Sequence, residues 1–593
     1  MSKQASFLSL LSPIQRVRPS DLERAMSVAG WLSSNWWEVR MGFNLTETHL
    51  ECLEKEERQV VGGWIKVIAR TRKQSKKHGF GALIQWRNMD GVLLQDIVFN
   101  RVLHGDQSRL IRDVLIDSGY WLEPYPQSWS RLQRYLLQEI LKAPAGICVD
   151  STGWHDSVYV TQDWCVGTNS EPYHYAGQLN ESMLKRAGTL SQWQSQVGAL
   201  CVGNPLMIFV VGVALSAPLL HPAAVENGIF HLVGPSSTGK TSLLELAASV
   251  YSDRSFVRSW ISTANGLAAV AAEQHDMMLG LDEIGLARPE DVDIATYHIV
   301  AGTSKLRATE SGGLAKPSHW RTLALSTGEV WLSEVFESLG KRPKAGQQIR
   351  LVEIPVFGQF GAFDVLHRFQ RPQLFVDHVK SQTSRYYGSL FPEWMNLLTS
   401  TYELAHYTKS EIQRLVDQWR TSSMSSQVIR VLQRFALVAT ALALASRNYL
   451  VPWDEEESID SVKHVLGQWL AARGHVMNTE EHQVLARLKV LLPKWEKALS
   501  PMGQQNTASL LGYSRDVNGE RQWLIDKSQF LRQLEMPGQY MREVMPLLQR
   551  GWLTTNEPER ATLKLMVNGR SRRFFALLPD RIFAGIQELE IDD

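Results

Sequence analysis

Short, mainly apolar runs recur between residues 228 and 355 of this chain, and polar or glycine-rich segments separate them. The runs are Gly228–Val233, Met277–Leu281, Trp320–Leu325 and Leu351–Ile354. Runs of this length without alternation are typical of strands buried on both faces, as in a parallel sheet covered by helices. Residues 242–250 follow the first run with a helical composition. The pattern therefore predicts an α/β domain over residues 188–360.

The patterns elsewhere predict four flanking parts. Residues 1–58 are interpreted as a helical N-terminal extension. Residues 59–187 combine short strands with helices at Leu110–Ser118 and Ser130–Leu141, which predicts a small α+β domain. Residues 361–503 predict a helical lid or linker region. In residues 504–593, helical segments precede two strand-like runs around Asn568-Gly569, which is the layout of a winged helix.

Composition indicates a globular and nearly neutral protein. With 593 residues, 44% of them hydrophobic, and a formal net charge of +1, the chain is long enough for several domains. The neutral balance argues against binding polyanions over the whole surface, but it is compatible with a local basic channel. The four cysteines are scattered without C-x-x-C spacing, so we expect no zinc site and a reducing compartment.

The sequence shows no targeting or membrane-spanning segment. Residues 1–11 lack the layout of a signal peptide. The apolar stretch Pro205–Leu220 is shorter than the roughly 20 residues that span a bilayer. We therefore expect a buried helix there, and a soluble, cytoplasmic protein with no membrane partner.

The most informative motif follows the first apolar run. Residues 234–241 read GPSSTGKT, a complete G-x-x-x-x-G-K-T phosphate-binding loop between a predicted strand and a predicted helix. Such glycines let backbone N–H groups turn toward phosphate oxygens, and the helix N-terminus adds partial positive charge. The lysine can reach the β- and γ-phosphates, and the threonine hydroxyl can bind Mg²⁺. ATP and Mg²⁺ are thus the predicted ligands of Gly234, Pro235, Ser236, Ser237, Thr238, Gly239, Lys240, Thr241 and Ser242.

Acidic and hydroxyl side chains end two further predicted strands. Asp282 and Glu283 come directly after the second apolar run, and the carboxyl ends of such strands form the sites of α/β proteins. We predict that Asp282 and Thr241 hold the Mg²⁺ shell, and that Glu283 orients and polarises the attacking water. Ser326 or Thr327, at the end of the third run, is predicted to place the water or to sense the γ-phosphate.

Cations near these motifs predict contacts with a second subunit and with nucleic acid. Arg350 precedes the last strand, where it can act on a neighbour's γ-phosphate as an arginine finger or form a salt bridge within its own domain. Residues 302–316 fit a hairpin that touches nucleic-acid phosphates, or an equally plausible solvated hairpin; its cations are Lys305, Arg307 and Lys316. The basic run 70–77 admits the same two interpretations. The winged part binds nucleic acid or protein; its basic residues include Arg570, Arg572 and Arg573.

In this order the motifs resemble those of the AAA+ helicase branch, which includes the minichromosome-maintenance and viral superfamily 3 helicases. More narrowly, the chain resembles the family catalogued as domain of unknown function 927, from about residue 60 to the C-terminus. The stretches that carry this resemblance are Gly153–His155, Gly188–Trp193, 234–241, Leu281–Glu283, Leu325–Glu329, Ala345–Arg350, Arg434–Ala439 and Trp469–Gly474.

The resemblance implies a multidomain α/β fold: an AAA+ P-loop ATPase core, an N-terminal α+β collar-like domain, a helical lid and a C-terminal winged helix. It implies a second-sensor role for Arg434 on a lid helix. It also implies an ATP-driven DNA helicase that forms homo-oligomeric rings, most plausibly hexamers, because members of that family include replicative helicases of mobile elements such as staphylococcal cassette chromosomes. A primase is a possible partner, whereas primase activity in this chain is not expected. Two alternatives remain open: an origin-melting initiator ATPase, and a non-helicase ATPase of a defence or remodelling system.

Overall fold

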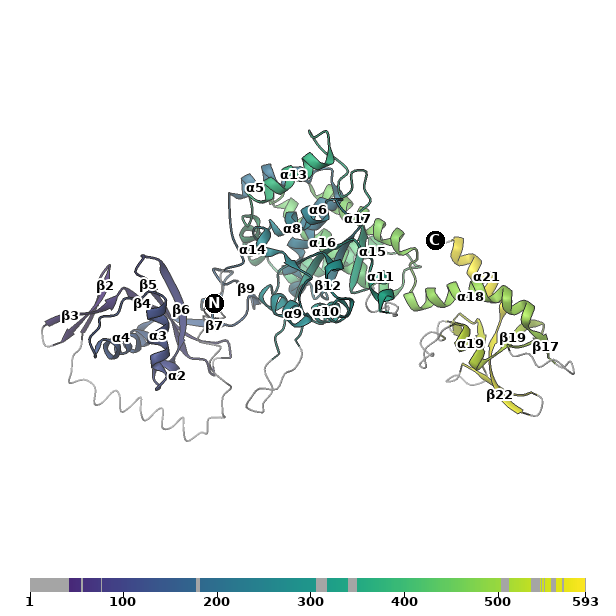
Figure 1. Cartoon of the computed structure of the whole chain (residues 1–593), viewed down its shortest axis with the longest axis horizontal. Helices are drawn as coiled ribbons and strands as arrows, with labels where there is room; N and C mark the ends of the chain where they lie inside the picture. Colours follow the sequence, from purple (N-terminus) through teal and green to yellow (C-terminus); the bar gives the residue numbers. More distant parts are fainter. Residues whose placement is uncertain are drawn as a thin grey trace.

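The chain folds into three lobes that follow one another in sequence order (Figure 1). The computed structural model describes residues 42–54, 57–75, 77–176, 182–304, 317–339, 349–502, 511–534, 544, 547–548, 550–555, 561–567 and 570–591. The central lobe holds most of the helices and the largest hydrophobic core.

The N-terminal lobe is built on a five-stranded sheet of order β11-β7-β4-β5-β6, and the helices α3 and α4 share its core with a small antiparallel sheet, β1-β2-β3. In the larger sheet β4, β5 and β6 are antiparallel neighbours, whereas β7 runs parallel to β4 and to β11. The elements are β1 Gly42–Leu45, β2 His49–Glu54, β3 Glu57–Gly63, β4 Ile65–Lys73, β5 Gly81–Arg87, β6 Leu93–Phe99, α2 Asn100–Leu103, α3 Ser108–Asp117, α4 Ser128–Lys142, β7 Ala145–Val149 and β11 Tyr173–Tyr175.

The predicted strands and the two predicted helices of this lobe are confirmed. The helical extension predicted for residues 1–58 is wrong in the part of it that the structure describes. Residues 42–54 form β1 and β2 rather than helix. Side chains alternate in β2, with Leu50 and Cys52 buried and His49 and Glu51 partly exposed. Alternation with a period of two is the signature of a half-buried strand. Here it extends over only a few residues, so it was not distinguished from the pattern of the preceding residues. Residues 1–41 lie outside the described part of the chain.

A three-stranded antiparallel sheet joins the N-terminal lobe to the central one. Its strands, in the order β10-β9-β8, are β8 Gly153–His155, β9 Val158–Val160 and β10 Cys165–Val166. The buried carboxylate of Asp276 accepts hydrogen bonds from the Trp154 backbone N–H at 2.9 Å and from the Arg321 guanidinium at 2.6 and 2.7 Å. Gly153 has φ +96°, and a Cβ there would lie 2.4 Å from that carboxylate. Glycine is therefore required where this sheet is fastened to the core.

The central lobe contains a five-stranded, fully parallel sheet of order β13-β14-β15-β12-β16. The elements are α5 Leu190–Gln196, α6 Pro205–Ser216, α7 Leu220–Ala223, β12 Gly228–Val233, α8 Lys240–Ala248, β13 Arg258–Ser259, α9 Ala264–Glu273, β14 Leu279–Asp282, α10 Pro289–Ala301, β15 Leu323–Gly328, α11 Leu332–Ser338 and β16 Leu351–Pro355. The alternation of strands and helices, predicted from the apolar runs, is confirmed.

Helices cover both faces of this sheet (Figure 1). One face packs against α9, α10 and α11, and the other against α6, α8 and the helices that follow the sheet. Those later helices are α13 Pro372–Thr383, α14 Leu390–Ser400, α15 Leu404–Trp419, α16 Ser426–Arg447 and α17 Glu455–Arg473. The next helix, α18 Thr479–Ala498, packs in the core of the C-terminal lobe instead. Residues of α13 to α17 lie in the same core as β12 and β16, so most of the predicted lid region shares its core with the sheet.

Two apolar segments, Pro205–Ala223 and Ser426–Arg447, are long and apolar enough to cross a membrane. Within the structure, however, 89% and 83% of their most apolar windows are buried. They form the centre of the helical layer, with Gly212 of α6 directly against Leu442 of α16. The predicted buried helix at residues 205–220 is therefore confirmed, and core packing accounts for the apolar character of both segments.

The C-terminal lobe is a mixed sheet flanked by α18, α19 and α21. Its other elements are β17 Ser500–Pro501, β18 Gly512–Val517, β19 Glu520–Asp526, α19 Lys527–Gln533, β20 Leu553–Thr554, β21 Leu563–Val567, β22 Arg570–Leu577 and α21 Pro579–Ile591. The predicted hairpin is present as the antiparallel pair β21–β22, and its Asn568-Gly569 turn lies outside the described residues. A second hairpin, β18–β19, turns at Asn518 and Gly519, with φ of +56° and +80°.

Candidate functional site

The glycine-rich segment 234–239 connects the carboxyl end of β12 to the N-terminus of α8. Its backbone enters the left-handed region at Ser237, with φ +63°, and at Gly239, with φ +95°. A Cβ at Gly239 would lie 2.7 Å from the ring of Phe363, so glycine is needed for both conformation and space. The strand–loop–helix arrangement predicted for the phosphate-binding loop is thus observed.

The Lys240 side chain lies inside this loop. Its ammonium donates hydrogen bonds to the carbonyl oxygens of Gly234, at 2.8 Å, and Pro235, at 2.6 Å, and the residue is only 6% exposed. Burial lowers the pKa of Lys240, while the negative charges of nearby carboxylates oppose that effect; they are Glu329, Glu283 and Asp282. A cation surrounded by loop carbonyls and carboxylates is well placed to meet phosphate oxygens at the mouth of the loop.

Asp282, at the end of β14, lies between two threonine hydroxyls. Its Oδ1 accepts hydrogen bonds from Thr327 Oγ1 at 2.6 Å and from Thr241 Oγ1 at 3.3 Å. The contact with Thr327 is possible because β15 lies between β12 and β14 in the sheet. Carboxylate and hydroxyl oxygens are the hard donors that Mg²⁺ prefers. The structure therefore brings together both residues predicted to hold the metal.

The structure also distinguishes between the two hydroxyls predicted at the end of β15. Thr327 Oγ1 bonds Asp282 and accepts a hydrogen bond from the Glu283 backbone N–H at 3.2 Å. Ser326 faces the opposite side of the strand, where its hydroxyl contacts Trp260 and His231 and is fully buried. Thr327 is thus the hydroxyl that reaches the site, and Ser326 belongs to the packing behind it.

Glu283 follows Asp282 in an unusual backbone conformation. Its φ is +57°, a region that residues other than glycine rarely adopt and that is commonly found at functional sites. Its carboxylate and that of Glu329 are the two whose charges act most strongly on Lys240. Glu329, exposed at the end of β15, was not among the predicted site residues, although it follows the predicted hydroxyl pair closely in sequence.

A segment after β16 forms one wall of the loop and was missed from the sequence. The Ala362 backbone N–H donates to the Thr238 carbonyl at 2.8 Å, and a Cβ at Gly361, whose φ is +75°, would lie 2.6 Å from that oxygen. Phe363 packs against Gly239. The sequence does offer one signal for this wall, the two glycines at positions 358 and 361. They were not recognised because the predicted domain boundary at residue 360 falls between them.

Arg350 lies at the amino end of the sheet, opposite the loop. It precedes β16, its carbonyl accepts a hydrogen bond from Ile229 of β12 at 2.9 Å, and its guanidinium lies 4.9 Å from the ring centroid of Tyr297 on α10. The six residues of β12 separate this end from the loop, a span of about 20 Å. Arg350 therefore does not reach the loop of its own chain.

The position of Arg434 does not fit the implied second-sensor role. Arg434, on α16, is 4% exposed and donates hydrogen bonds to the carbonyls of Ile349 and Arg350. A Cβ at Gly228, the first residue of β12, would lie 2.4 Å from its guanidinium. This is again the end of the sheet remote from the loop, and burial lowers the pKa of Arg434 to about 10. The motif match at Arg434–Ala439 reflects packing of α16 on the sheet.

The predicted nucleic-acid contacts of the central lobe lie outside the described residues; they are Lys305, Arg307 and Lys316. The ends of the segment that carries them do lie together, because Thr303 pairs with His319, and the Ser304 N–H donates to the Ser318 carbonyl at 2.9 Å. In the basic run 70–77, Arg72 forms an ion pair with Glu171 at 2.7 Å and Lys73 one with Asp150 at 3.1 Å. Two cations of that run are therefore already neutralised.

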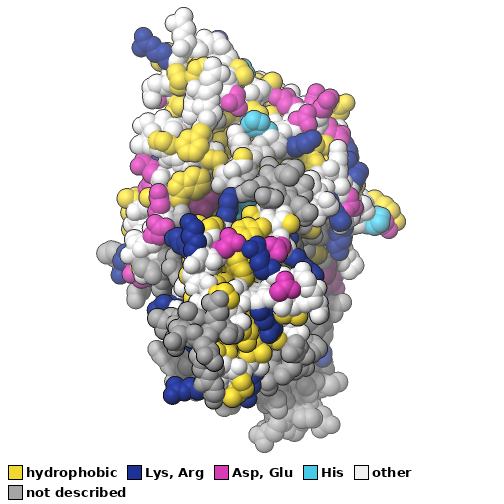
Figure 2. Space-filling view, turned by 90° about the vertical axis from the view of Figure 1, so that its right-hand side faces the viewer, with side chains coloured by type: hydrophobic (Ala, Val, Ile, Leu, Met, Phe, Trp, Pro, Cys, Tyr) yellow, Lys and Arg dark blue, Asp and Glu magenta, His cyan; other side chains and the backbone are white. Residues whose placement is uncertain are grey.

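The C-terminal arginines do not share one surface. Residues alternate between the faces of a strand, so Arg570 and Arg572 lie on one face of β22 and Arg573 lies on the other. Arg572 also forms an ion pair with Asp526 at 2.9 Å. Figure 2 looks onto the end of the molecule that carries this lobe, and among the residues that the structure describes there, basic side chains are interspersed with acidic ones.

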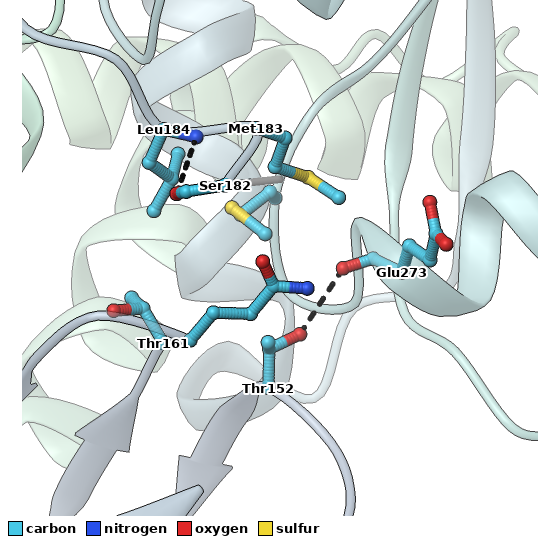
Figure 3. A pocket seen from close by; sticks show the side chains of 8 residues that line it. Thr152, Thr161, Ser182, Met183, Leu184 and Glu273 are labelled. Carbon is cyan, nitrogen blue, oxygen red and sulfur yellow. Dashed lines mark hydrogen bonds between the residues drawn. The ribbon is translucent and has the colours of Figure 1, made fainter. Parts of the chain in front are cut away.

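Two hollows lie where the β8–β10 sheet meets the central lobe. One, drawn in Figure 3, has a volume of about 10 Å³ beside the hydrogen bond from the Thr152 hydroxyl to the Glu273 carbonyl. That is room for one water molecule. A neighbouring cleft of about 530 Å³ has Asp150, Glu273 and Arg321 in its lining. Arg321 is paired with Asp276, and Asp150 is paired with Lys73.

Comparisons with known proteins agree with this architecture. Residues 41–320 match the model of a family described as Domain of unknown function (DUF927). A solved structure entitled "SCCmec type IV Cch - active helicase" is similar, with a TM-score of 0.63 and 17% identity, covering 93% of this chain and 100% of that one. Another, "The A form apo structure of NrS-1 C terminal region-CTR", has a TM-score of 0.33 and 10% identity over 87% of this chain and 96% of that one. Among curated proteins none matches the chain. The first similarity shows a shared fold.

Proposed function

We propose that this chain is an ATPase of the AAA+ helicase branch that couples ATP hydrolysis to movement along DNA. The observation that carries the proposal is the convergence of Lys240, Thr241, Asp282 and Thr327 at the carboxyl end of one parallel sheet. Three strands of the sheet, β12, β14 and β15, and the loop after β12 supply these residues, which leaves an accidental glycine-rich turn as a poor explanation. The fold shared with a protein entitled an active helicase supports DNA as the partner.

Each residue of the site has a distinct role in this proposal. Backbone N–H groups of residues 236–241, at the loop and the N-terminus of α8, bind the triphosphate, and Lys240 neutralises its charge. Thr241 and Asp282 hold Mg²⁺, which when bound would neutralise the charge that develops on the phosphates. Glu283 orients and polarises the attacking water. Thr327 keeps Asp282 and the Glu283 backbone in register.

The position of Arg350 supports assembly of several copies. Because its side chain lies at the far end of its own sheet, a role in hydrolysis requires the loop of a neighbouring subunit. Head-to-tail contacts of this kind close into rings, so we propose a cytoplasmic ring, as a hexamer, around single-stranded DNA. The C-terminal lobe would be the winged helix that contacts duplex at the fork, and the hairpin predicted at residues 302–316 would contact nucleic acid.

The test is steady-state ATP turnover with and without single-stranded DNA, together with unwinding of a labelled fork, using Lys240→Ala as the blank. Turnover that DNA stimulates and that strand separation accompanies supports the helicase function. Melting of duplex without processive unwinding would indicate an initiator. Turnover that is indifferent to DNA would indicate a remodelling or defence ATPase, and no Lys240-dependent turnover would exclude all three.

A further inference from the structure

A row of polar side chains crosses the central sheet behind the candidate site. Ser326 on β15, His231 on β12 and Glu353 on β16 are register partners on adjacent parallel strands, so they lie side by side on one face. Ser326 and His231 are 0% exposed. Uncompensated polar groups are costly in such a position. His231 can be read in the run Gly228–Val233, but its partners on β15 and β16 become visible only in the structure.

The hydrogen bonds of this row fix one arrangement of protons. The Trp260 indole N–H, which can only donate, bonds Ser326 Oγ at 2.8 Å. The single hydroxyl proton of Ser326 is then available for His231 Nδ1, at 3.0 Å. That leaves the proton of the imidazole on Nε2, which lies 3.4 Å from the Val330 carbonyl. Burial lowers the pKa of His231 to about 4, so the ring is in the neutral form that this arrangement needs.

The imidazole also determines the shape of the chain around Thr327. It bonds Ser326, the residue before Thr327, and Val330, three residues after it. Between them lies Gly328, where a Cβ would be 3.1 Å from the His231 ring and 2.5 Å from Ile284. The end of β15 thus packs closely against the His231 ring. Thr327 lies on the opposite side of this strand, where it bonds Asp282.

We propose that His231 is a positioning residue for ATP hydrolysis, because it holds the end of β15 so that Thr327 can bridge Asp282 and the Glu283 backbone. His231 belongs to the strand that leads into the phosphate-binding loop. One side chain therefore ties the phosphate-binding strand to the strand that carries Thr327. This inference rests on the proposed ATPase function and adds a residue to it.

Three variants test the inference in the full-length chain. His231→Leu removes both polar contacts at similar volume, Ser326→Ala removes the serine hydroxyl, and the third combines the two. Each single variant should lower kcat by about 10-fold, as a small displacement of catalytic groups does, while the dissociation constant of ATP stays within about 2-fold. Because both residues act in one chain of contacts, the double variant should be no slower than the slower single variant.

Two further variants separate positioning from general damage to the fold. His231→Asn offers an amide oxygen to Ser326 and should recover part of the lost kcat. Ser216→Ala removes an equally buried hydroxyl, bonded to the Val213 carbonyl in α6, and should leave kcat unchanged. If His231→Leu does not fold, Ser326→Ala and His231→Asn still decide the question.

Three results would overturn the role of His231: an unchanged kcat, losses of kcat and ATP affinity that follow a lowered melting temperature, or defects of the two single variants that multiply. Each of these would leave the Lys240-dependent turnover of the wild type in place, and with it the proposed function. Absence of that turnover in the wild type would instead overturn both proposals.

Discussion

The two ends of the central sheet differ although the same strands form them. At the carboxyl end, Lys240, Asp282 and Thr327 lie within hydrogen-bonding distance of the loop or of one another, beside the exposed loop residues Pro235–Ser237. At the amino end, the guanidinium of Arg434 is buried and satisfied by backbone carbonyls, and Arg350 stacks on Tyr297. The carboxyl end thus gathers the residues predicted to bind a ligand, whereas the side chains of Arg434 and Arg350 at the amino end contact other parts of the same chain.

This difference indicates a division of labour. Backbone conformations that cost free energy occur at the carboxyl end, at Ser237 and Glu283, where a bound ligand can compensate for strain. The amino end instead fixes the position at which Arg350 leaves the sheet. We therefore expect substitutions at the carboxyl end to act on chemistry within one subunit, and substitutions at the amino end to act either on hydrolysis in a neighbouring subunit or on stability.

The largest expected effect tests whether the amino end acts on another subunit. Arg350→Ala should lower kcat by about 10³-fold, since an arginine finger contributes at least that much, with ATP binding retained. Mixing the variant with wild type should lower turnover by more than simple dilution, measured as ATP turnover at a fixed total concentration. Arg430→Ala, at an exposed position on α16, is the control. Normal ATP turnover in Arg350→Ala would contradict the proposal that the amino end of the sheet acts on the site of a neighbouring subunit.

At the carboxyl end, Glu283→Gln should lower kcat by about 10²-fold or more, because the amide cannot accept a proton from the attacking water. ATP affinity should stay close to that of the wild type, since Lys240 and the loop are unchanged. Single-turnover hydrolysis and ATP binding measure the two effects separately. The matched control is Glu290→Gln, an exposed glutamate in the first turn of α10. Equal losses of binding and turnover would contradict the assignment.

The same two ends show what could be predicted from sequence. The loop, Asp282 and Thr327 were predictable because each lies in a short contiguous motif beside an apolar run. The place of Arg434 at the amino end of the sheet was not predictable, because the pattern shows which helix carries it but not which end of the sheet that helix covers. Its neighbours, Gly228 and Ile349, are far from it in sequence, and only the packed structure brings them together.

Other differences have equally local causes. The hairpin β18–β19 was missed although Asn518-Gly519 is a favoured turn sequence, because its strands are partly polar. Arg572 was predicted to contact nucleic acid, and its partner Asp526 is remote in sequence. The sequence shows that residue 572 carries a positive charge, but only the tertiary structure shows that an acidic side chain neutralises it. The DNA contacts of the C-terminal lobe therefore stay a prediction.

Arg434→Leu tests whether the amino end mainly stabilises the fold. The substitution removes the charged donor of the Ile349 carbonyl, whereas the Arg350 carbonyl keeps its hydrogen bond from the Ile229 N–H. A hydrogen bond from a charged group contributes about 1.5–3 kcal/mol. We expect the thermal unfolding temperature to fall and ATP affinity to persist. Arg414→Leu, at a half-exposed ion pair on α15, should have little effect on either. A loss of ATP affinity with unchanged stability would instead support the second-sensor role of Arg434. The two ends of the sheet would then not differ in the way described above.

The smallest expected effect concerns Glu353, which accepts a hydrogen bond from the Leu332 backbone N–H at the start of α11. Burial raises the pKa of Glu353 from 4.5 to about 7, so between these values the folded chain keeps a proton that the unfolded chain has released. Stability due to this group therefore falls as pH rises from about 4.5 to 7 and stays constant above that. Glu353→Gln lacks this dependence.

The two proteins should accordingly melt at similar temperatures near pH 5, and the variant should melt higher near pH 8, by an amount equivalent to roughly 1–3 kcal/mol. His231 and Glu334 face the same group or act on it, but they are present in both proteins, so the difference in melting temperature isolates Glu353. If the variant melts lower at pH 8, the ionised carboxylate stabilises the folded chain and the pKa of Glu353 is not raised. The row behind the site would then already carry a charge between about pH 5 and 7, and the neutral arrangement of protons assigned to His231 would have to be replaced.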